Sequence, residues 1–188
     1  MSPSRQYRKK GSITSVAFCK LPVPQRHSDN PRKAESIVKQ NQIPPFFFCT
    51  DRGGLNYADD LGHCTEVQQL SSAVDTMLFY EERCRLVIIT RSLLLTQYQV
   101  GEDGRVSRVN QAKLSVAGDV AEKGIQDVVW AGPGILAIAT QEKMIRLLDL
   151  AADENYNLSL SSAGGELISR NDYVYTLAYN PLDRYLVV

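Results

Sequence analysis

The chain of 188 residues is poor in the side chains that catalysis and metal binding need. It contains two histidines, His27 and His63, which stand far apart in the sequence. A zinc site needs a second, closely spaced pair of ligands, and acid–base catalysis needs titratable groups in a shared cleft. The phosphate-binding patterns G-x-x-x-x-G-K-[ST] and G-x-G-x-x-G are also missing. The sequence therefore predicts a protein that is not an enzyme, with no catalytic, cofactor-binding or metal-binding residue and no small-molecule substrate.

Cysteine is sparse as well, and long apolar runs are missing. Cys19, Cys49, Cys64 and Cys84 form no C-x-x-C pair, which fits a reducing compartment where thiols serve as small buried apolar groups. No apolar run approaches the ~18–20 residues of a membrane span. The start, MSPSRQYRKKGS, lacks the apolar core of a signal peptide. We expect a protein of cytosolic type without a transmembrane segment.

The formal net charge is zero, but the positive charge is concentrated at the N-terminus. Residues 1–40 contain nine Lys and Arg against Asp29 and Glu35. Such asymmetry can provide a basic arm for an acidic partner, or it can be a solvated tail and loop, which we favour. Interleaved aromatics are missing apart from Tyr7, so no nucleic-acid partner is expected. Residues 1–11 are predicted to be a disordered basic tail.

What the chain does have is a series of short β-type runs separated by turn residues, seen most clearly between Gly124 and Leu160. This stretch contains four runs, at Ile125–Trp130, Ile135–Thr140, Met144–Leu150 and Tyr156–Leu160. Four successive strands joined by tight turns make an antiparallel meander of about 35–40 residues, the size of a β-propeller blade. One blade cannot bury its own faces, so neighbouring blades are required.

Similar runs occupy most of the remaining chain. They lie at Ser12–Cys19, Phe46–Thr50, Leu55–Ala58, Cys64–Leu70, Val74–Tyr80, Arg85–Thr90, Leu93–Val100, Val106–Leu114, Tyr173–Tyr179 and Tyr185–Val188. The predicted fold class is all-β, a WD40-type β-propeller forming an incomplete arc of about three and a half four-stranded blades. The predicted domain, 12–188, comprises blades at about 12–70, 73–116 and 124–160 and a truncated blade at 173–188.

The spacing of marker residues supports this repeat. Thr50, Thr90 and Thr140 each close a second strand, at intervals of 40 and 50 residues. First strands end near Phe79, Trp130 and Tyr179, at intervals of 51 and 49 residues, and these aromatics are interpreted as core fillers. Nine residues beyond each threonine stand Asp59, Gln99 and Asp149, the place where a WD-type blade carries the Asp of its Trp-Asp pair.

One insertion interrupts the first predicted blade. Residues 20–45 contain five prolines among polar and charged residues, a composition that excludes a central strand and is typical of a long loop. Long loops in compact domains are often functional. The insertion is therefore our candidate for a partner contact. The alternative is a loop of variable sequence that has no binding role.

Several stretches resemble a known family. They are FFFCTDRGGLNYADDLGHCTEV (Phe46 to Val67), MLFYEERCRLVIIT (Met77 to Thr90), LLLTQYQV (Leu93 to Val100) and IRLLDLAADENYNLSL (Ile145 to Leu160). They resemble the N-terminal WD-repeat region of the intraflagellar transport protein 140 family, subunits of ciliary transport complex A (IFT-A). That family has two N-terminal propellers followed by a helical repeat array. The present chain lacks the array, so a fragment, a truncated isoform or an incomplete gene model is expected.

The resemblance implies a non-enzymatic scaffold in retrograde ciliary transport, cilium assembly and ciliary entry of membrane receptors. The implied partners are other IFT-A subunits and membrane-receptor cargo adaptors. The implied locations are the cilium (axoneme and basal body), cytoplasm and cytoskeleton. The alternative is a WD-repeat scaffold of a vesicle coat or other trafficking complex away from cilia. A propeller hydrolase is disfavoured because two histidines in loops supply too little chemistry. Uncovered blade faces predict marginal stability for the isolated chain.

Overall fold

The computed structural model describes residues 12–19, 44–116, 124–160 and 173–188. The predicted tail at 1–11, and the predicted insertion apart from its last two residues, lie outside this part of the chain. The described residues belong to two compact units. One comprises the chain up to Ile88 together with Thr96–Asn110, and the other comprises Ile89–Leu95 together with Gln111–Val188.

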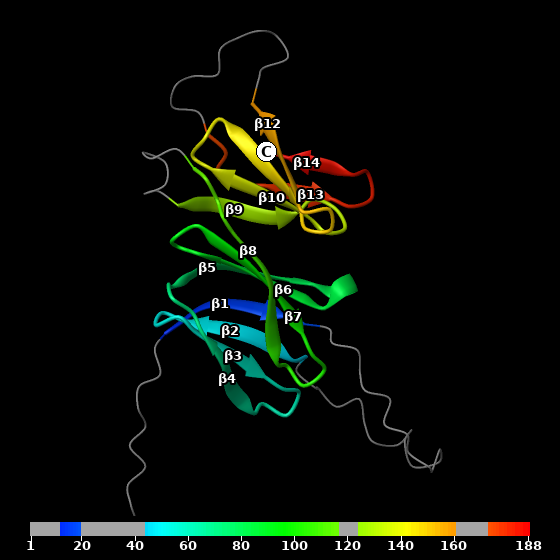
Figure 1. The fold of residues 1–188 in the computed structure, drawn as a ribbon. Helices are drawn as coiled ribbons and strands as arrows, with labels where there is room; N and C mark the ends of the chain where they lie inside the picture. The colour runs from blue at the N-terminus through cyan, green and yellow to red at the C-terminus, as the bar shows by residue number, and fades with distance from the viewer. Residues whose placement is uncertain (1–11, 20–43, 117–123, 161–172) are drawn as a thin grey trace, which may run out of the picture. The chain divides into compact units, whose positions relative to one another are not determined.

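The described residues form three four-stranded antiparallel sheets and one two-stranded sheet (Figure 1). The first sheet contains β1 (Ile13–Phe18), β2 (Phe46–Thr50), β3 (Gly54–Ala58) and β4 (Cys64–Gln69). The second contains β5 (Val74–Tyr80), β6 (Arg85–Thr90), β7 (Leu94–Val100) and β8 (Val106–Lys113). The third contains β9 (Ile125–Trp130), β10 (Ile135–Thr140), β11 (Met144–Asp149) and β12 (Glu154–Ser159). The last contains β13 (Ala178–Asn180) and β14 (Tyr185–Val187).

Within each sheet the strands lie in the order of the sequence, so each strand pairs with the strands that precede and follow it in that sheet. This meander of four strands is the blade pattern of β-propellers. The predicted fold class, an all-β WD40-type propeller of about three and a half blades, is therefore confirmed. Among the described residues, no helix has the length and apolar character that a membrane span requires.

The core of the first unit lies between the first and second sheets. Alternate residues of β2 point to opposite faces, so Phe47 and Cys49 are fully buried while Phe46 and Phe48 stay partly exposed. Phe47 pairs with Ala17 on β1 and with Tyr57 on β3. The cluster around them takes in side chains from β5, β6 and β7, namely Val74, Met77, Phe79, Leu86, Ile88, Tyr98 and Val100.

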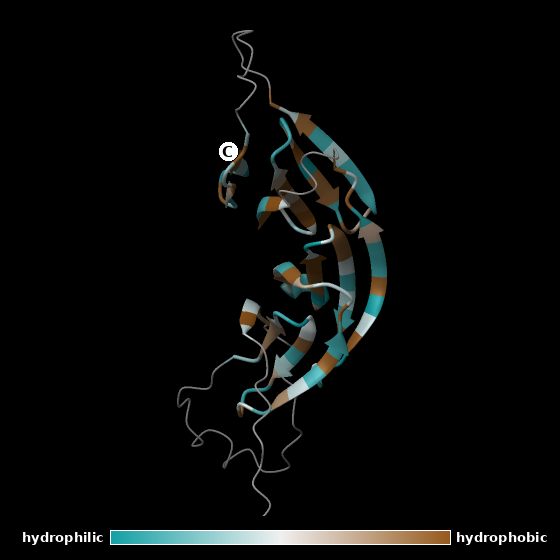
Figure 2. Ribbon diagram, turned by 90° about the vertical axis from the view of Figure 1, so that its left-hand side faces the viewer, coloured by the Kyte–Doolittle hydropathy of each residue, from teal (hydrophilic) through white to brown (hydrophobic). Residues whose placement is uncertain are grey.

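The core of the second unit lies on one face of the third sheet. Ala137 and Ala139 of β10 and Ile145 of β11 contact Val174 and Leu177, which precede β13. Residues of β10 are almost all fully buried, whereas all of β12 is exposed. In Figure 2 some strands are largely brown while others are banded in teal and white, which matches this difference.

Three strand predictions need correction, each because of a specific backbone contact. Leu93 was expected inside a strand, but it adopts a φ of 60° and its N–H donates to Thr90 O in the β6–β7 turn. The strand expected at Tyr156 begins at Glu154, which pairs with Asp149 directly after Asp153 (φ 58°) completes the turn.

The strand expected at Tyr173–Tyr179 is only Ala178–Asn180. The N–H of Leu177 donates to Asp127 Oδ2 on β9 at 2.7 Å instead of joining a strand ladder, and Thr176 Oγ1 donates to the same oxygen at 2.9 Å. The three marker aromatics, which were interpreted as core fillers, differ in burial. Phe79 is buried, whereas Trp130 and Tyr179 are only half-buried.

Candidate interaction surfaces

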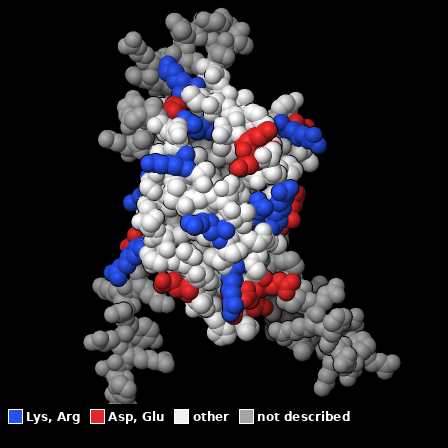
Figure 3. Space-filling model, viewed as in Figure 1, with Lys and Arg blue, Asp and Glu red and all other residues white. Residues whose placement is uncertain are grey.

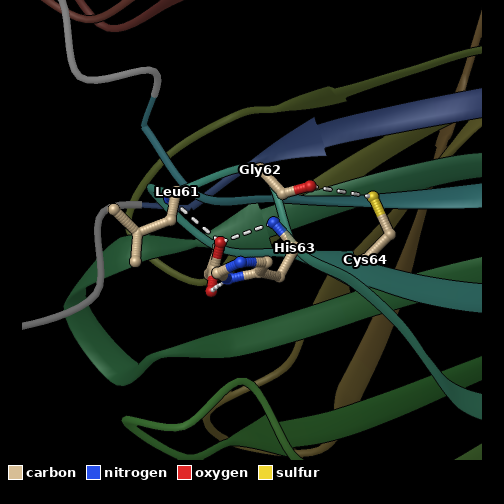
Figure 4. A network of polar contacts seen from close by, with 5 residues as sticks. Leu61, Gly62, His63 and Cys64 are labelled. Atoms are coloured by element: carbon tan, nitrogen blue, oxygen red, sulfur yellow. Dashed lines mark hydrogen bonds and ion pairs between the residues drawn. The ribbon is translucent and has the colours of Figure 1, made fainter.

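The turn between β3 and β4 is held in one conformation by the side chain of Asp59. Its Oδ1 accepts hydrogen bonds from the backbone N–H groups of Leu61 (2.9 Å) and His63 (2.8 Å), and its Oδ2 lies 3.0 Å from His63 Nδ1 (Figure 4). Gly62 has a φ of 83°, which a side chain would disfavour. This fixed turn presents Leu61 to solvent, 72% exposed.

The pKa of the Asp59 carboxyl reflects these contacts. Partial desolvation raises the pKa, but the hydrogen bonds from His63 and Leu61, together with the charge of the His63 imidazole, outweigh it. The pKa of Asp59 is therefore lowered below its usual value. The ionised carboxylate is the form that holds the turn.

The two other residues at this repeat position show how far the repeat extends. Asp149 Oδ1 accepts from the N–H groups of Ala151 (2.8 Å) and Ala152 (3.0 Å), so it holds the β11–β12 turn as Asp59 holds the β3–β4 turn. Gln99 instead donates from Nε2 to the carbonyls of Arg83 and Cys84. The spacing marked the same place in each sheet, and the structure shows that the aspartates at two of these places hold a turn whereas Gln99 has a different role.

The three marker threonines also act on turns, those that join the second and third strands of each sheet. Thr50 Oγ1 accepts from the Gly54 N–H, and Thr90 Oγ1 accepts from the Leu94 N–H. Thr140 Oγ1 donates to Glu142 Oε2 at 2.9 Å. Glu142 in turn holds Arg146 through two contacts of 2.8 Å each, and both side chains are mostly buried.

An apolar surface remains on the first sheet, opposite its core. It consists of Val16 and Phe18 on β1 and Phe46 and Phe48 on β2, here called the first-sheet face. Val16 pairs with Phe48 and Phe18 pairs with Phe46, so all four side chains project to the same side. The Phe46 ring lies 5.7 Å from that of Phe18 and 6.0 Å from that of Phe48. Phe18 is 61% exposed.

A second apolar surface lies on the two-stranded sheet. Tyr185 and Val187 of β14, here called the last-sheet face, are 66% and 59% exposed. Leu186 between them points to the opposite side, where it packs on the core of the third sheet. Sequence reasoning did not identify either face. The alternation of residues between the two sides of a strand, around Phe47 and around Leu186, was the available signal for these faces. It does not show which side of a strand stays uncovered.

Residues considered for chemistry lie apart from one another. His63 is exposed in the β3–β4 turn, and His27 lies outside the described residues. Within the described ranges, no three His, Cys, Asp or Glu side chains stand close enough to hold a metal ion. In the view of Figure 3, Lys and Arg are dispersed among Asp and Glu over a mostly uncharged surface.

The four thiols are free and fall into two classes. Cys19 and Cys49 are buried as expected, and burial raises the pKa of each thiol to about 12, with an electrostatic interaction with Cys84 a smaller cause for Cys19. Cys64 is exposed and Cys84 is half-buried. The expectation of buried thiols is therefore confirmed for Cys19 and Cys49 and wrong for Cys64, while Cys84 is partly buried against the core of the first unit.

Comparison with solved structures supports the fold. The computationally designed Ika4 protein is similar with a TM-score of 0.53 and 12% sequence identity, over 93% of this chain and 83% of Ika4. BamB from Moraxella catarrhalis is similar with a TM-score of 0.50 and 16% identity, over 81% of this chain and 38% of BamB. At these identities the likeness concerns the fold alone.

A family model described as the IFT140 first beta-propeller matches residues 24–187. Because this match spans most of the chain, the chain belongs to the IFT140 first β-propeller family.

Proposed function

We propose that the chain is a non-enzymatic protein-interaction scaffold within IFT-A, acting in retrograde ciliary transport, cilium assembly and ciliary entry of membrane receptors. The observation that carries the proposal is the family match over residues 24–187. Its partners are other IFT-A subunits and membrane-receptor cargo adaptors. It acts in the cilium, at the axoneme and basal body, and in the cytoplasm and cytoskeleton.

The arrangement of side chains supports a scaffold role on physical grounds. The hairpins of a blade leave turns and outer strands free to contact partners, and here Asp59 and Asp149 hold two such turns in fixed conformations. A turn that is already ordered loses less conformational entropy on binding than a flexible one. The exposed strands β4 and β12, which follow these two turns, add surface beside them.

The test is proximity labelling with the tagged 188-residue chain in ciliated cells. The proposal predicts enrichment of IFT-A subunits over vesicle-coat subunits, and a signal at the axoneme and basal body. Enrichment of coat subunits with no ciliary signal would favour the alternative, a trafficking scaffold away from cilia, and would reject the proposal.

A matched pair of variants shows whether the enrichment depends on the folded sheets. Gly104→Ala places a Cβ against the ring of Tyr57, whereas Gly62→Ala places one in open space. Both glycines have positive φ. Enrichment is expected to persist in Gly62→Ala and to fall in Gly104→Ala. Equal enrichment in both variants would mean that the labelled partners do not recognise the blade fold.

A further inference from the structure

One carboxylate on β9 holds the segment that leads into β13. Asp127 Oδ2 accepts the Thr176 hydroxyl at 2.9 Å and the Leu177 N–H at 2.7 Å, from positions 49 and 50 residues further along the chain. The other oxygen, Oδ1, accepts the N–H of Val128 at 2.8 Å, which fixes the carboxylate on its own strand. All four residues belong to the second unit. A single side chain therefore fastens residues 173–177 to the third sheet.

The fastened segment covers part of the core of the second unit. Val174 and Leu177 are buried and belong to the same apolar cluster as Ala137, Ala139 and Ile145 of the third sheet. Residues 173–177 are not part of a strand, so Asp127 provides the Leu177 N–H with the hydrogen bond that a strand ladder would otherwise supply. Loss of the Asp127 contact would loosen the cover over this apolar cluster.

Thr176 is open to solvent as well as bonded to Asp127. Among the residues that the structure describes, the exposed threonines are Thr14, Thr65 and Thr176. Thr14 lies within β1 and Thr65 within β4, whereas Thr176 precedes β13 and lies outside the strands. An enzyme that modifies a hydroxyl must take the surrounding segment into its own cleft, which pairing within a sheet prevents. Of the three, Thr176 is therefore the one that such an enzyme can reach.

We propose that Thr176 is a phosphorylation site and that its phosphate releases residues 173–177 from the third sheet. A serine/threonine protein kinase transfers the γ-phosphoryl group of ATP to Thr176 Oγ1. The bond between the γ-phosphorus and the bridging oxygen breaks, ADP leaves, and the hydroxyl proton is released. Thr176 thereby loses the hydrogen that it donates to Asp127. The phosphate carries about −1.5 to −2 charges at pH 7 and is repelled by a neighbouring carboxylate.

The expected consequence is an apolar surface that appears only after modification. Once the segment is released, Val174 and Leu177 become accessible, and the side of the third sheet that they cover becomes available to a partner. Phosphorylation that melts a segment is a common form of regulatory switch. This regulation goes beyond the scaffold role and does not depend on any ciliary partner.

The first experiment determines whether the site is used. The tagged 188-residue chain is expressed in ciliated cells, phosphatases are blocked with okadaic acid, and phosphopeptides of the purified chain are identified by mass spectrometry. Phosphate is expected on Thr176, at higher occupancy than on Thr14 or Thr65, and the signal should disappear in Thr176→Val. A Thr176 without phosphate, or with no more than the other two, overturns the proposal. The readout is made on the chain itself, so it is independent of whether IFT-A subunits are enriched.

The second experiment determines whether the phosphate opens the segment. Phosphothreonine is introduced at position 176 of the purified chain by codon expansion, and hydrogen exchange of the Leu177 amide is measured. Exchange is expected to be at least about tenfold faster than in the parent chain, because it requires the local opening that the Asp127 contact opposes. Slow exchange of the β10 amides should persist. Unchanged exchange at Leu177, or an equal loss of protection in β10, contradicts a local switch.

A matched variant tests whether the charge of Asp127 is what the phosphate acts on. Asp127→Asn keeps an oxygen that accepts hydrogen bonds but removes the negative charge. In this variant, phosphate on Thr176 is expected to accelerate Leu177 exchange by a smaller factor than in the parent chain. Thr176→Val, which removes the donated hydroxyl without adding charge, is also expected to have a smaller effect than the phosphate. An equal acceleration by phosphate with and without the Asp127 charge would show that repulsion does not drive the release.

Discussion

Gly104 in the β7–β8 turn lies directly against the ring of Tyr57 on β3. A Cβ at position 104 would lie 2.3 Å from both Tyr57 Cδ1 and Cε1, and the residue has a φ of 77°. On its other side Tyr57 packs against Phe47 in the core, with 5.1 Å between the two ring centroids. The hairpin tip of the second sheet can approach the first sheet only because residue 104 has no side chain.

Gly104→Ala is therefore expected to destabilise the chain by about 2–4 kcal/mol, from the left-handed backbone and the overlap with the ring together. The free energy of unfolding from urea titration measures the effect. Gly62→Ala is the control, since its φ of 83° is similar but a Cβ there meets nothing within 4 Å. It is expected to cost about 1 kcal/mol. Equal losses for the two variants would show that the Tyr57 contact does not exist.

The two faces of the first sheet predict different responses to the same substitution. Phe47→Ala removes a completely buried ring and is expected to cost about 3–5 kcal/mol. Phe18→Ala, on the first-sheet face, is expected to cost about 1 kcal/mol or less in the monomer, because most of its ring is already in water. Chemical denaturation at low protein concentration compares them. A larger loss for Phe18→Ala would mean that the faces are assigned the wrong way round.

Breaking the mostly buried Glu142–Arg146 ion pair is expected to lower the stability of the fold strongly. Removing Glu142 leaves the mostly buried Arg146 guanidinium uncompensated, so Glu142→Ala is expected to cost about 3 kcal/mol. Arg105→Ala breaks the exposed contact between Arg105 and Asp103 and is expected to cost less than about 1 kcal/mol. Thermal unfolding of both variants checks the difference. A Glu142→Ala variant as stable as Arg105→Ala would contradict the buried geometry.

The lowered pKa of Asp59 predicts a contribution to stability that depends on pH. A carboxyl with a depressed folded-state pKa stabilises the fold above its unfolded-state pKa of about 3.9, and the contribution is lost as pH falls through the folded-state value. In Asp59→Asn the stability deficit relative to the parent chain is therefore expected to be constant near neutral pH and to shrink below about pH 4. Leu61→Ala keeps both backbone donors and is expected to show no such change. If the stability deficit of Asp59→Asn grew as the pH fell, the lowered pKa of Asp59 in the folded chain would be refuted.

Thiol reactivity separates the buried cysteines from the exposed one. Cys64 is expected to react rapidly with iodoacetamide at pH 8. Cys19 and Cys49 are expected to stay unmodified in the folded chain, because they are buried and a pKa of about 12 keeps each thiol protonated. In urea all three should react. Peptide mass spectrometry follows each site, and labelling of Cys49 at the rate of Cys64 would contradict its burial.

Most strands could be predicted because their signals are local. Phe46–Thr50 and Ile135–Thr140 were predicted with the bounds found in the structure, since each is an apolar run that ends at a threonine before a turn. The positions of Asp59 and Asp149 at the end of the third strand also followed a local rule, the spacing from Thr50 and Thr140, whereas their hydrogen bonds to the turns came from the structure.

What the sequence could not show depends on partners far away in the chain. The segment before β13 has a strand-like pattern, but Asp127 accepts the N–H of Leu177 across 50 residues and keeps it out of a ladder. Likewise, Phe46-Phe47-Phe48 is uniformly apolar, so nothing in the run indicates that one side remains uncovered. Whether the side of β2 with Phe47 or the side with Phe46 and Phe48 is buried depends on which side the second sheet covers.

The packing of the second sheet against the first is the central claim about the first unit, and the position of Met77 tests this packing directly. Its Sδ on β5 lies 4.0 Å from Cys49 Sγ on β2. The chain has only three methionines, Met1, Met77 and Met144, so selective methyl labelling yields few signals. We predict nuclear Overhauser cross-peaks from the Met77 methyl group to Cys49 and its neighbours on the first sheet. Cross-peaks from Met77 to its own sheet alone would contradict the stacked arrangement.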